Sequence, residues 1–541
     1  MTRFAELEKK RNGMLAAETG AVSKSGHCPL EVGLVALSPY AVAMDGLGFQ
    51  TVYRLFNEHP EVRCERVFFI NRRSGVEKGE WLSLESGRRP RDFTVLACSI
   101  SYEQEILRLP GILQEAGVPL YAAERAGDAP ILFCGGPVIT ANPEPAAAFI
   151  DVCGIGDSER LVPEFAELWL AALERRWSRQ RLLAELAGRP GFYVPSLYRI
   201  NTTDHSGYPA VPVPESSAPP KVPRLSAPLD RKPLHSVIVS SATHFKNMFL
   251  VEIARGCRHN CRFCLVCQVN RPYRHADAQR IVEALDAVPP RARTIGLVGA
   301  NLCDHPELEM IIEEVARRGF RLGVSSLRVD TVSRNLLELL QACRVKSLTL
   351  APETASEELL GRIGKRYVRE RLFEVVGLIA KTGFESLKLY YMTGLPGEQD
   401  RHRQELISQV KELAGVVGPR MKLKISLNTF IPKPQTAWQD EPMFAPAQIK
   451  QALRQLRRGL AGRGAAVQLK TGPVAESLAQ AALSLGDRTM ARAVVRSATG
   501  GERFLDCLAQ EGIELETVLC QMKKPTLEHP WSVLECEPLQ E

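Results

Sequence analysis

The 541-residue sequence lacks the hallmarks of membrane, secreted and low-complexity proteins. It has no apolar run that approaches membrane-spanning length, and its first seven residues are too polar for a signal peptide. No low-complexity tract interrupts it, and 45% hydrophobic with 24% charged residues is ordinary for globular proteins. The sequence therefore predicts a soluble, cytoplasmic protein without a membrane partner. Its length predicts two or three domains.

Dense clusters of Lys and Arg with interleaved aromatic residues are also missing. The net charge of +7 is compatible with an acidic partner such as RNA, but the positive charge is spread thinly along the chain. A solvated surface explains this charge better than a nucleic-acid interface does. Nucleic acid is thus a disfavoured partner, though not an excluded one.

Fourteen cysteines are present, and three of them are closely spaced. Without a secretion signal, reduced thiols and a metal site are favoured over disulfides. Cys257, Cys261 and Cys264 form a Cys-x3-Cys-x2-Cys pattern directly after residues 249–256, which predict a buried strand that ends in a glycine turn. The thiols should lie on a loop at the C-terminal end of a strand, where chemistry collects in α/β barrels and open α/β sheets.

The ligand type alone does not choose the metal, because thiolates suit iron–sulfur clusters and zinc equally well. Three cysteines can bind three irons of a cubane cluster and leave the fourth iron open to substrate. Structural zinc typically uses two separated ligand pairs, and no second pair stands out downstream. Neither zinc nor a set of unrelated buried cysteines accounts for both the spacing and the preceding strand. Cys267 could complete a four-cysteine cluster, but a buried thiol is the favoured interpretation.

Strand and helix patterns alternate over the N-terminal third. Buried strands are predicted at residues 32–38, 67–70, 93–98, 118–121 and 131–134. This alternation predicts a Rossmann-like parallel-sheet domain over residues 1–200. Residues 201–240 contain eight prolines between Pro209 and Pro233 and predict an extended linker.

A second α/β region follows the linker. Six strands are predicted, at residues 249–256, 294–298, 321–326, 347–350, 386–391 and 423–430. With the helices between them, they predict a partial (β/α)6 barrel of the TIM type over residues 241–445. Residues 446–541 predict a helical C-terminal region that could cap the substrate side of the barrel. The whole chain is therefore expected to be an α/β protein.

The cysteine spacing, with Phe263 before the last thiol, resembles the cluster loop of the radical S-adenosylmethionine (SAM) superfamily. The resemblance implies an enzyme with a [4Fe-4S] cluster on Cys257, Cys261 and Cys264, whose open iron chelates the methionine portion of SAM. It also implies one-electron cleavage of SAM to a 5′-deoxyadenosyl radical, with a reductant such as flavodoxin or ferredoxin. The implied reaction is radical modification of an unknown substrate, with methyl transfer as one form.

Residues that follow later strands resemble segments that contact SAM in this family. The matching residues are Ser326, Arg328, Glu353, Gly394 and Pro396. An arginine at position 328 suits the carboxylate of SAM, because guanidinium and carboxylate pair bidentately. The second strand ends in Gly299-Ala300-Asn301, without the glutamate that the family often has there. The resemblance therefore leaves the contact to the amino group of SAM unassigned.

Two glycine loops, Gly135-Gly136 and residues 154–159, resemble those of cobalamin-binding domains that precede radical SAM barrels. In such domains a histidine after the first strand often ligates cobalt, but residues 39–48 contain none. Either cobalamin binds without a protein ligand to cobalt, or the domain has the fold alone, which we favour. The chain thus resembles a group of largely uncharacterised bacterial radical SAM proteins with a degenerate N-terminal domain, and that resemblance implies no substrate.

Two other functions remain alternatives. An RNA-modifying radical SAM enzyme would usually carry an RNA-binding module and a second cluster, and neither is apparent in the sequence. A non-catalytic iron–sulfur redox sensor or electron carrier would need Cys267 as a fourth ligand and would not depend on SAM.

Overall fold

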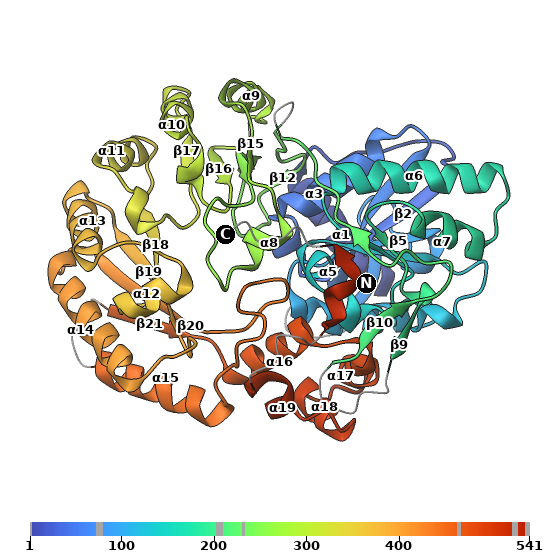
Figure 1. Ribbon diagram of the computed structural model, residues 1–541. Coiled ribbons are helices and arrows are strands. Elements are labelled where there is room, and N and C mark those ends of the chain that lie inside the picture. Colours follow the sequence, from blue (N-terminus) through green and yellow to red (C-terminus); the bar gives the residue numbers. More distant parts are fainter. Residues whose placement is uncertain are drawn as a thin grey trace.

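A computed structural model describes residues 3–71, 79–201, 209–229, 233–461, 467–521 and 528–535. Figure 1 shows an N-terminal domain beside a crescent of strands and outer helices, with the C-terminal helices below the two. Of the helices in these ranges, none is both long and apolar enough to cross a membrane.

The N-terminal domain is built on a seven-stranded sheet with the order β4-β3-β2-β5-β6-β7-β8. The strands are β2 (Leu30–Val35), β3 (Val62–Asn71), β4 (Gly79–Ser83), β5 (Val95–Ser99), β6 (Ile131–Gly135), β7 (Val152–Gly154) and β8 (Phe192–Tyr193). The five central strands are parallel, whereas β4 and β8 are antiparallel edges. The chain order reverses between β2 and β5, and ligands of such sheets bind outside the carboxyl ends of the strands at this point.

Four of the five strands predicted in this domain are present. They correspond to β2, β3, β5 and β6. The strand predicted at residues 118–121 is wrong: these residues form the turn between α4 (Leu109–Ala116) and a 3-10 helix at Ala122–Glu124. Pro119 has no N–H to donate to a strand ladder, so this apolar run is used for burial at the end of α4.

Helices cover both faces of the sheet. α3 (Leu47–Glu58), α6 (Ser158–Glu174) and α7 (Arg179–Ala187) share one hydrophobic core with β2 and β3. α4 lies in a second core that continues into the barrel and the C-terminal helices. The N-terminal sheet and the barrel are therefore joined by buried apolar contacts.

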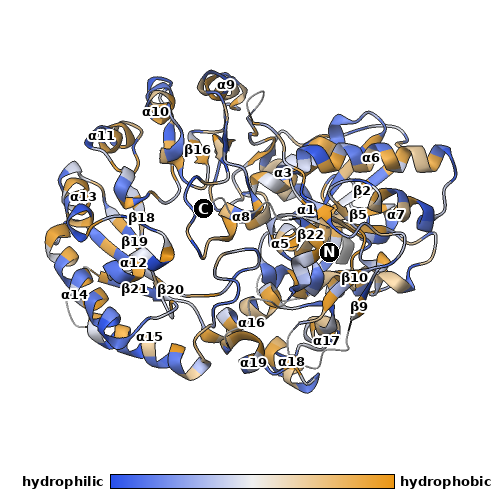
Figure 2. Ribbon diagram, viewed as in Figure 1, coloured by the Kyte–Doolittle hydropathy of each residue, from blue (hydrophilic) through white to orange (hydrophobic). Residues whose placement is uncertain are grey.

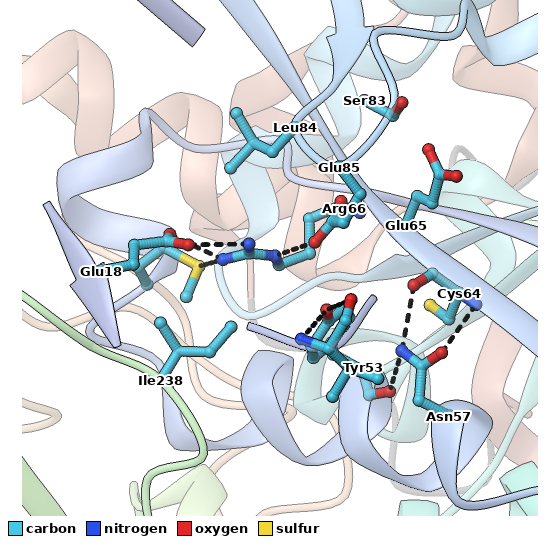
Figure 3. Close-up of polar contacts among 12 residues, drawn as sticks. Glu18, Tyr53, Asn57, Cys64, Glu65, Arg66, Ser83, Leu84, Glu85 and Ile238 are labelled. Atoms are coloured by element: carbon cyan, nitrogen blue, oxygen red, sulfur yellow. Dashed lines mark hydrogen bonds and ion pairs between the residues drawn. The ribbon is translucent and has the colours of Figure 1, made fainter. Parts of the chain in front are cut away.

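The side chain of Arg66 on β3 is fully buried, and Figure 3 shows its polar contacts. Its Nη1 and Nη2 donate to Glu18 at 2.7 and 2.8 Å, and its Nε donates to Glu85 at 2.7 Å. Burial alone would lower the pKa of Arg66, but Glu85 and Glu18 outweigh it and raise this pKa above its ordinary value. The guanidinium therefore ties β1 (Glu18–Thr19) and the segment after β4 to the sheet.

The proline-rich linker makes short ladders with both ends of the chain. β10 (Val211–Pro214) pairs with β9 (Tyr198–Asn201), and β12 (Val239–Ser240) pairs with β1. β11 (Val222–Pro223) pairs with β22 (Leu534–Glu535) near the C-terminus. The described part of the linker is thus fixed to the surface of the molecule by backbone hydrogen bonds.

All six predicted barrel strands are present. They are β13 (Met248–Glu252), β16 (Thr294–Val298), β17 (Arg321–Gly323), β18 (Ser347–Glu353), β19 (Ser386–Thr393) and β20 (Lys422–Thr429). Together with β21 (Val467–Thr471) they form two parallel sheets, β13-β16-β17 and β18-β19-β20-β21, which meet only at an isolated bridge between Leu327 and Leu350 in the described chain. The barrel is therefore partial.

A seventh strand extends the barrel sheet beyond residue 445, where the sequence predicts the end of the barrel. β21 (Val467–Thr471) pairs in parallel with β20, and α15 (Pro446–Leu460) connects the two. The β/α alternation of the barrel thus continues to residue 471. The sequence did not reveal β21 because only two of its five residues, Val467 and Leu469, are apolar. The helical region proper begins with α16 (Val474–Leu485).

Amphipathic helices cover the outer face of the barrel. These are α9 (Ala278–Ala284), α10 (Leu308–Arg317), α11 (Arg334–Ala342), α13 (Arg369–Thr382), α14 (Asp400–Val417) and α15. Figure 2 shows their hydrophobic and hydrophilic residues in alternation. On β19, Leu387, Leu389 and Tyr391 are buried, whereas Lys388 and Tyr390 between them are only half-buried. Alternate residues of the strands therefore face the helices and the inside of the crescent.

The C-terminal helices pack against the N-terminal domain as well as the barrel. α17 (Ala491–Gly500) contacts α4, and α16 contacts residues 103–108. A buried polar cluster joins the three regions: Lys433, after β20, donates to Glu103 and to Ser484 on α16. Gln480 also donates to Glu103, at 2.9 Å. The C-terminal helices thus hold the N-terminal domain and the barrel together.

Candidate active site

The cysteine loop, residues 257–264, runs from β14 (Ala254–Arg255) to α8 (Leu265–Val269). Neighbours from two later segments of the barrel hold its backbone: the N–H of Arg262 donates to the carbonyl of Ile363 at 3.0 Å, and Trp438 N–H donates to the carbonyl of Arg262 at 3.1 Å. On the other side, Nε2 of His259 lies 3.0 Å from Oδ1 of Asp304. The shape of the loop is therefore imposed by surrounding structure.

Asp304, which follows β16, is the main polar anchor of the loop. Besides contacting His259, its Oδ1 accepts a hydrogen bond from Nδ2 of Asn301 at 2.7 Å. Tyr273 donates its hydroxyl proton to the carbonyl of Asp304 at 2.9 Å. Burial alone would raise the pKa of Asp304, but His259 and Asn301 outweigh it and hold this pKa below its ordinary value. The carboxylate is therefore kept charged, as an acceptor.

The thiols of the loop differ in ionisation. The neighbouring thiol of Cys267, whose one proton can be shared with either sulfur, lowers the pKa of Cys257 to about 6 and that of Cys264 to about 7, chiefly by hydrogen bonding. Burial raises the pKa of Cys261 to about 11, against the opposing effects of Lys365 and Arg328. Because the thiolate is the form that binds metal, two of the three motif cysteines are ready to act as ligands near neutral pH.

Cys267 lies beside the three motif cysteines but is bonded differently. Its side chain is almost fully buried, and its Sγ donates to the carbonyl of His259 at 2.9 Å. Its hydrogen bonds with Cys257 and Cys264 raise its own pKa above the ordinary range. Cys267 is therefore a protonated donor to the loop in this structure.

The donor set fits a cubane iron–sulfur cluster better than a single ion. In the described parts of the chain, no three His, Cys, Asp or Glu side chains converge closely enough to hold one metal ion. A cubane does not need such convergence, because each thiolate binds a different iron. The neighbouring cations Arg328 and Lys365 suit the negative charge that thiolates bring to such a site.

Two residues predicted to contact SAM lie near the cysteines but already have partners. Arg328 donates from Nε and Nη2 to Asp330 at 3.0 and 2.9 Å. Glu353 has a φ of +67°, a left-handed conformation that is rare outside glycine, and accepts from Nζ of Lys365 at 2.8 Å. Ser326 is half-buried on the loop that leads to Arg328. These groups surround the cluster loop from the ends of β17 and β18.

Phe263 and the loop of Gly394 and Pro396 are brought together by an apolar cluster. Phe263 packs against Leu395, Phe430 and Trp438, together with residues of α12 (Glu357–Ile363). Gly394 has a φ of +80°, and its N–H donates to Glu398 at 2.7 Å. The glycine-rich loop is therefore shaped by Glu398 and lies beside the aromatic residue of the cysteine motif.

The glycine loops of the N-terminal domain serve the packing of the chain itself. Gly136 has a φ of +99°, and a Cβ there would lie 2.6 Å from the carbonyl oxygen of Ile100. Gly156 has a φ of +122°, and its Cβ would lie 2.0 Å from the carbonyl oxygen of Leu225 in the linker. The close approach that these glycines allow is thus used by the backbone of the protein.

The second glycine loop also connects the two domains electrostatically. Asp157 forms ion pairs with Arg255 and Arg274 of the barrel at 3.0 and 2.9 Å. Arg255 also pairs with Glu159 at 2.8 Å and with Glu252 at 2.7 Å. This loop therefore fixes the N-terminal domain to the strand that leads to the cysteines.

A cavity of about 450 Å3 lies at the carboxyl ends of the N-terminal strands, near the switch point, where the chain order reverses between β2 and β5. It is lined by the ends of β5, β6 and β7, the first turn of α3, and Glu252, Arg255 and Asn270 of the barrel. None of the described residues that line it is a histidine. The volume is within the range of small-molecule sites.

The sequence did not reveal His259, Asp304 and Lys365 as site residues. His259 lies inside the cysteine motif, and Asp304 follows the second barrel strand by a few residues, so their positions alone could have marked them as candidate site residues. Lys365 follows the glycine that ends α12, and nothing in the local sequence marks it as a site residue. The pairing of each with a residue far along the chain is visible only in the fold.

Comparisons with known proteins cover both domains. Residues 251–410 match the family "Radical SAM superfamily", and residues 48–195 match "Radical SAM proteins, N-terminal". An uncharacterized protein of Methanocaldococcus jannaschii is 26% identical over 412 residues, which are 76% of this chain and 81% of that protein. The ribosomal protein uS12 methylthiotransferase RimO of Desulforudis audaxviator is 26% identical over 179 residues, which cover 30% of this chain and 39% of the relative.

A solved structure with similarity to this chain is the radical S-adenosylmethionine methyltransferase TsrM from Kitasatospora setae, with a tryptophan substrate and a SAM analogue bound. Its TM-score is 0.48 at 14% identity, covering 73% of this chain and 72% of that chain. The two family matches together cover more than half of the sequence, and one of them includes the cysteine loop. The chain therefore belongs to the radical SAM superfamily, whose enzymes use a [4Fe-4S] cluster and SAM.

Proposed function

We propose that this chain cleaves SAM reductively at a [4Fe-4S] cluster held by Cys257, Cys261 and Cys264 and modifies a substrate with the resulting radical. One electron, delivered by a reductant such as flavodoxin or ferredoxin, breaks a carbon–sulfur bond of SAM and gives methionine and a 5′-deoxyadenosyl radical. The observation that carries the proposal is the set of three thiols on one loop at the mouth of the barrel. Cys267 is already hydrogen-bonded to the carbonyl of His259, so three ligands remain for four irons.

Polar groups beside the loop suit the charged methionine end of SAM. Oδ1 of Asn301 is a buried acceptor without a hydrogen-bond partner in the described chain, and it is free to accept from the ammonium group. Arg328, which otherwise pairs with Asp330, offers a bidentate donor for the carboxylate. In this role Asn301 replaces the glutamate that the family often has after the second strand.

The apolar cluster around Phe263 and Leu395 excludes water from the same end of the barrel. Exclusion of water protects a reactive radical from side reactions. The loop of Gly394 and Pro396 lies beside Phe263 and is assigned to support the adenine of SAM. The protein thereby aims the radical, and the cofactor supplies its chemistry.

Anaerobic reconstitution with iron and sulfide tests the proposal. We expect about four irons per chain, an EPR signal of the reduced cluster that changes when SAM is added, and 5′-deoxyadenosine as a product. A spectrum that is indifferent to SAM, with no cleavage product, would contradict the proposal and support a redox sensor or electron carrier. Affinity for RNA that falls steeply with salt would instead favour an RNA-modifying enzyme.

The cavity at the switch point favours a second candidate, cobalamin-dependent methyl transfer. It lies between the N-terminal sheet and Glu252 and Arg255, the residues that lead to the cysteine loop. Because no histidine lines its described walls, cobalt would have no imidazole ligand from them. Absorption spectra of protein purified after growth with cobalamin test this candidate. Protein without a corrinoid spectrum under these conditions would contradict it.

A further inference from the structure

The inner face of the barrel sheet carries lysines on neighbouring strands. In the register of β19 and β20, Lys388 lies directly opposite Lys424. On β21, Lys470 lies opposite Ser426, two residues further toward the carboxyl end of β20. All three lysines alternate with residues that face the outer helices, so their side chains line the inside of the crescent.

These lysines have no acidic partner in the described parts of the chain. Nζ of Lys388 contacts the hydroxyl of Tyr390 at 3.1 Å and lies 4.5 Å from the centre of its ring. Lys424 is half-buried and Lys470 is exposed, and neither forms an ion pair with a described carboxylate. Other barrel cations are matched, as Arg328 is by Asp330 and Lys365 is by Glu353.

An unmatched pair of this kind opposes folding. Neighbouring strands are about 4.8 Å apart, so Lys388 and Lys424 place like charges side by side. Like charges directly opposite each other destabilise a sheet, and partial burial reduces the screening by water. A matched carboxylate or a neutral side chain would remove this cost, and the sheet has neither at these positions. The arrangement therefore suits a ligand that brings the missing negative charge.

We infer that Lys388, Lys424 and Lys470 form an inner wall of the barrel that binds the anionic end of the substrate, through the oxygens of its phosphate or carboxylate groups. This inference rests on the proposed function. Lys388 lies five residues before Thr393, the last residue of β19, which corresponds to about 16 Å along the strand. The cysteine loop lies at the carboxyl ends of the barrel strands. The substrate is therefore elongated, with its anionic group deep in the barrel and its reacting carbon toward the mouth.

The test compares anion binding by two double variants of the reconstituted full chain. Lys388→Gln/Lys424→Gln removes the opposed pair. The control, Lys411→Gln/Lys450→Gln, removes two exposed lysines of the outer helices α14 and α15, so both variants have the same net charge. Calorimetric titration with pyrophosphate and with citrate, at constant ionic strength, is the measurement. We expect saturable binding by the wild type and the control, and at least tenfold weaker binding by Lys388→Gln/Lys424→Gln.

The two anions distinguish the sources of charge. Tighter binding of pyrophosphate indicates a phosphorylated substrate, and tighter binding of citrate indicates a carboxylate. Wild-type protein that binds neither anion saturably, or an inner-wall variant that binds as tightly as the control, would overturn the inference. Formation of 5′-deoxyadenosine is measured in the same samples. Failure of the proposed function appears as anion binding without SAM cleavage, and failure of this inference appears as cleavage without anion binding.

Discussion

The N-terminal sheet and the inner wall of the barrel differ in whether their cations have carboxylate partners. Arg66 is fully buried, and two carboxylates, Glu18 and Glu85, accept hydrogen bonds from it. Lys388 and Lys424 are partly exposed, lie opposite each other and have no carboxylate among the residues that the structure describes. A charge that is matched within the chain holds elements together, whereas an unmatched one is available to a ligand.

The same contrast separates the cysteines of the cluster loop. The single thiol proton of Cys267 lies within hydrogen-bond distance of the carbonyl of His259, and the pKa of Cys267 is raised, whereas the pKa values of Cys257 and Cys264 are lowered and their thiolate forms are favoured. We therefore propose Cys267 as part of the architecture of the loop, and Cys257 and Cys264, together with the buried Cys261, as the metal ligands.

The largest effect is expected at the motif cysteines. Cys257→Ala, Cys261→Ala and Cys264→Ala should each abolish cluster assembly, because each leaves only two protein thiolates and two of the four irons of a cubane without a protein ligand. Cys267→Ala should retain the cluster. Iron and sulfide content after anaerobic reconstitution is the measurement, and Cys343→Ala, at a buried thiol beneath the outer helices, is the control. Loss of the cluster in Cys267→Ala would show that Cys267 is a ligand and would contradict its separation from the three motif cysteines.

A large loss of stability is expected when a matched cation is removed. Arg66→Met leaves Glu18 and Glu85 buried without a counter-charge, which should lower the free energy of unfolding by about 3–5 kcal/mol. Urea unfolding of the cluster-free chain measures it. Arg54→Met, which breaks a surface pair with Glu58, should cost at most about 0.5 kcal/mol. Equal decreases in the free energy of unfolding of both variants would show that the buried pairs of Arg66 contribute no more to stability than a surface ion pair.

The sequence predicts the parts of this molecule that depend on local pattern. The six barrel strands, the main N-terminal strands and the cysteine loop all follow from alternating hydrophobicity and from spacing within about eight residues. The strand at residues 118–121 was predicted wrongly because an apolar run shows burial but not the backbone conformation. β21 was missed because only two of its five residues are apolar. Local pattern thus gives most of the elements, but neither every element type nor every boundary.

The parts that could not be predicted depend on residues far apart in the chain. The glycines at 136 and 156 resemble those of cobalamin-binding loops, and the fold shows that each packs closely against the chain's own backbone, at Ile100 and Leu225, while also lining the cavity. Nothing local distinguishes the two uses of a glycine. In the same way, the roles of Asp304 and Lys365 follow from His259 and Glu353, which the fold brings to them. Tertiary pairing decides whether a polar residue is matched, and the sequence does not show it.

A smaller, pH-dependent effect is expected at the matched pair of Glu103 and Lys433. Burial alone would raise the pKa of Glu103, but Lys433, Ser484 and Gln480 outweigh it and hold this pKa below its ordinary value of 4.5. The folded state therefore binds the proton less readily than the unfolded state. The stabilisation is complete above pH 4.5 and is lost as the pH falls through the folded pKa.

Glu103→Gln removes this ionisation and should lower the free energy of unfolding by about 2 kcal/mol at pH 7. The difference from the wild type should narrow as the pH falls below 4.5. Urea unfolding between pH 3 and pH 7 measures it, with Glu476→Gln on the exposed side of α16 as the control. A difference that stays constant down to pH 3 would show that the carboxylate acts only through its shape and hydrogen bonds.

The smallest effect, and the one of opposite sign, is expected on the unmatched wall. Lys424→Gln removes one of two like charges that lie opposite each other, so the variant should be as stable as the wild type or more stable by up to about 1 kcal/mol at low salt. The gain should vanish near 1 M salt, where charges are screened over about 3 Å. Lys450→Gln on the outer face of α15 should show neither effect. A structural lysine would behave in the reverse way, since its loss would lower stability at every salt concentration. The sign of this small difference therefore decides whether the wall is kept for folding or, at a cost to folding, for a ligand.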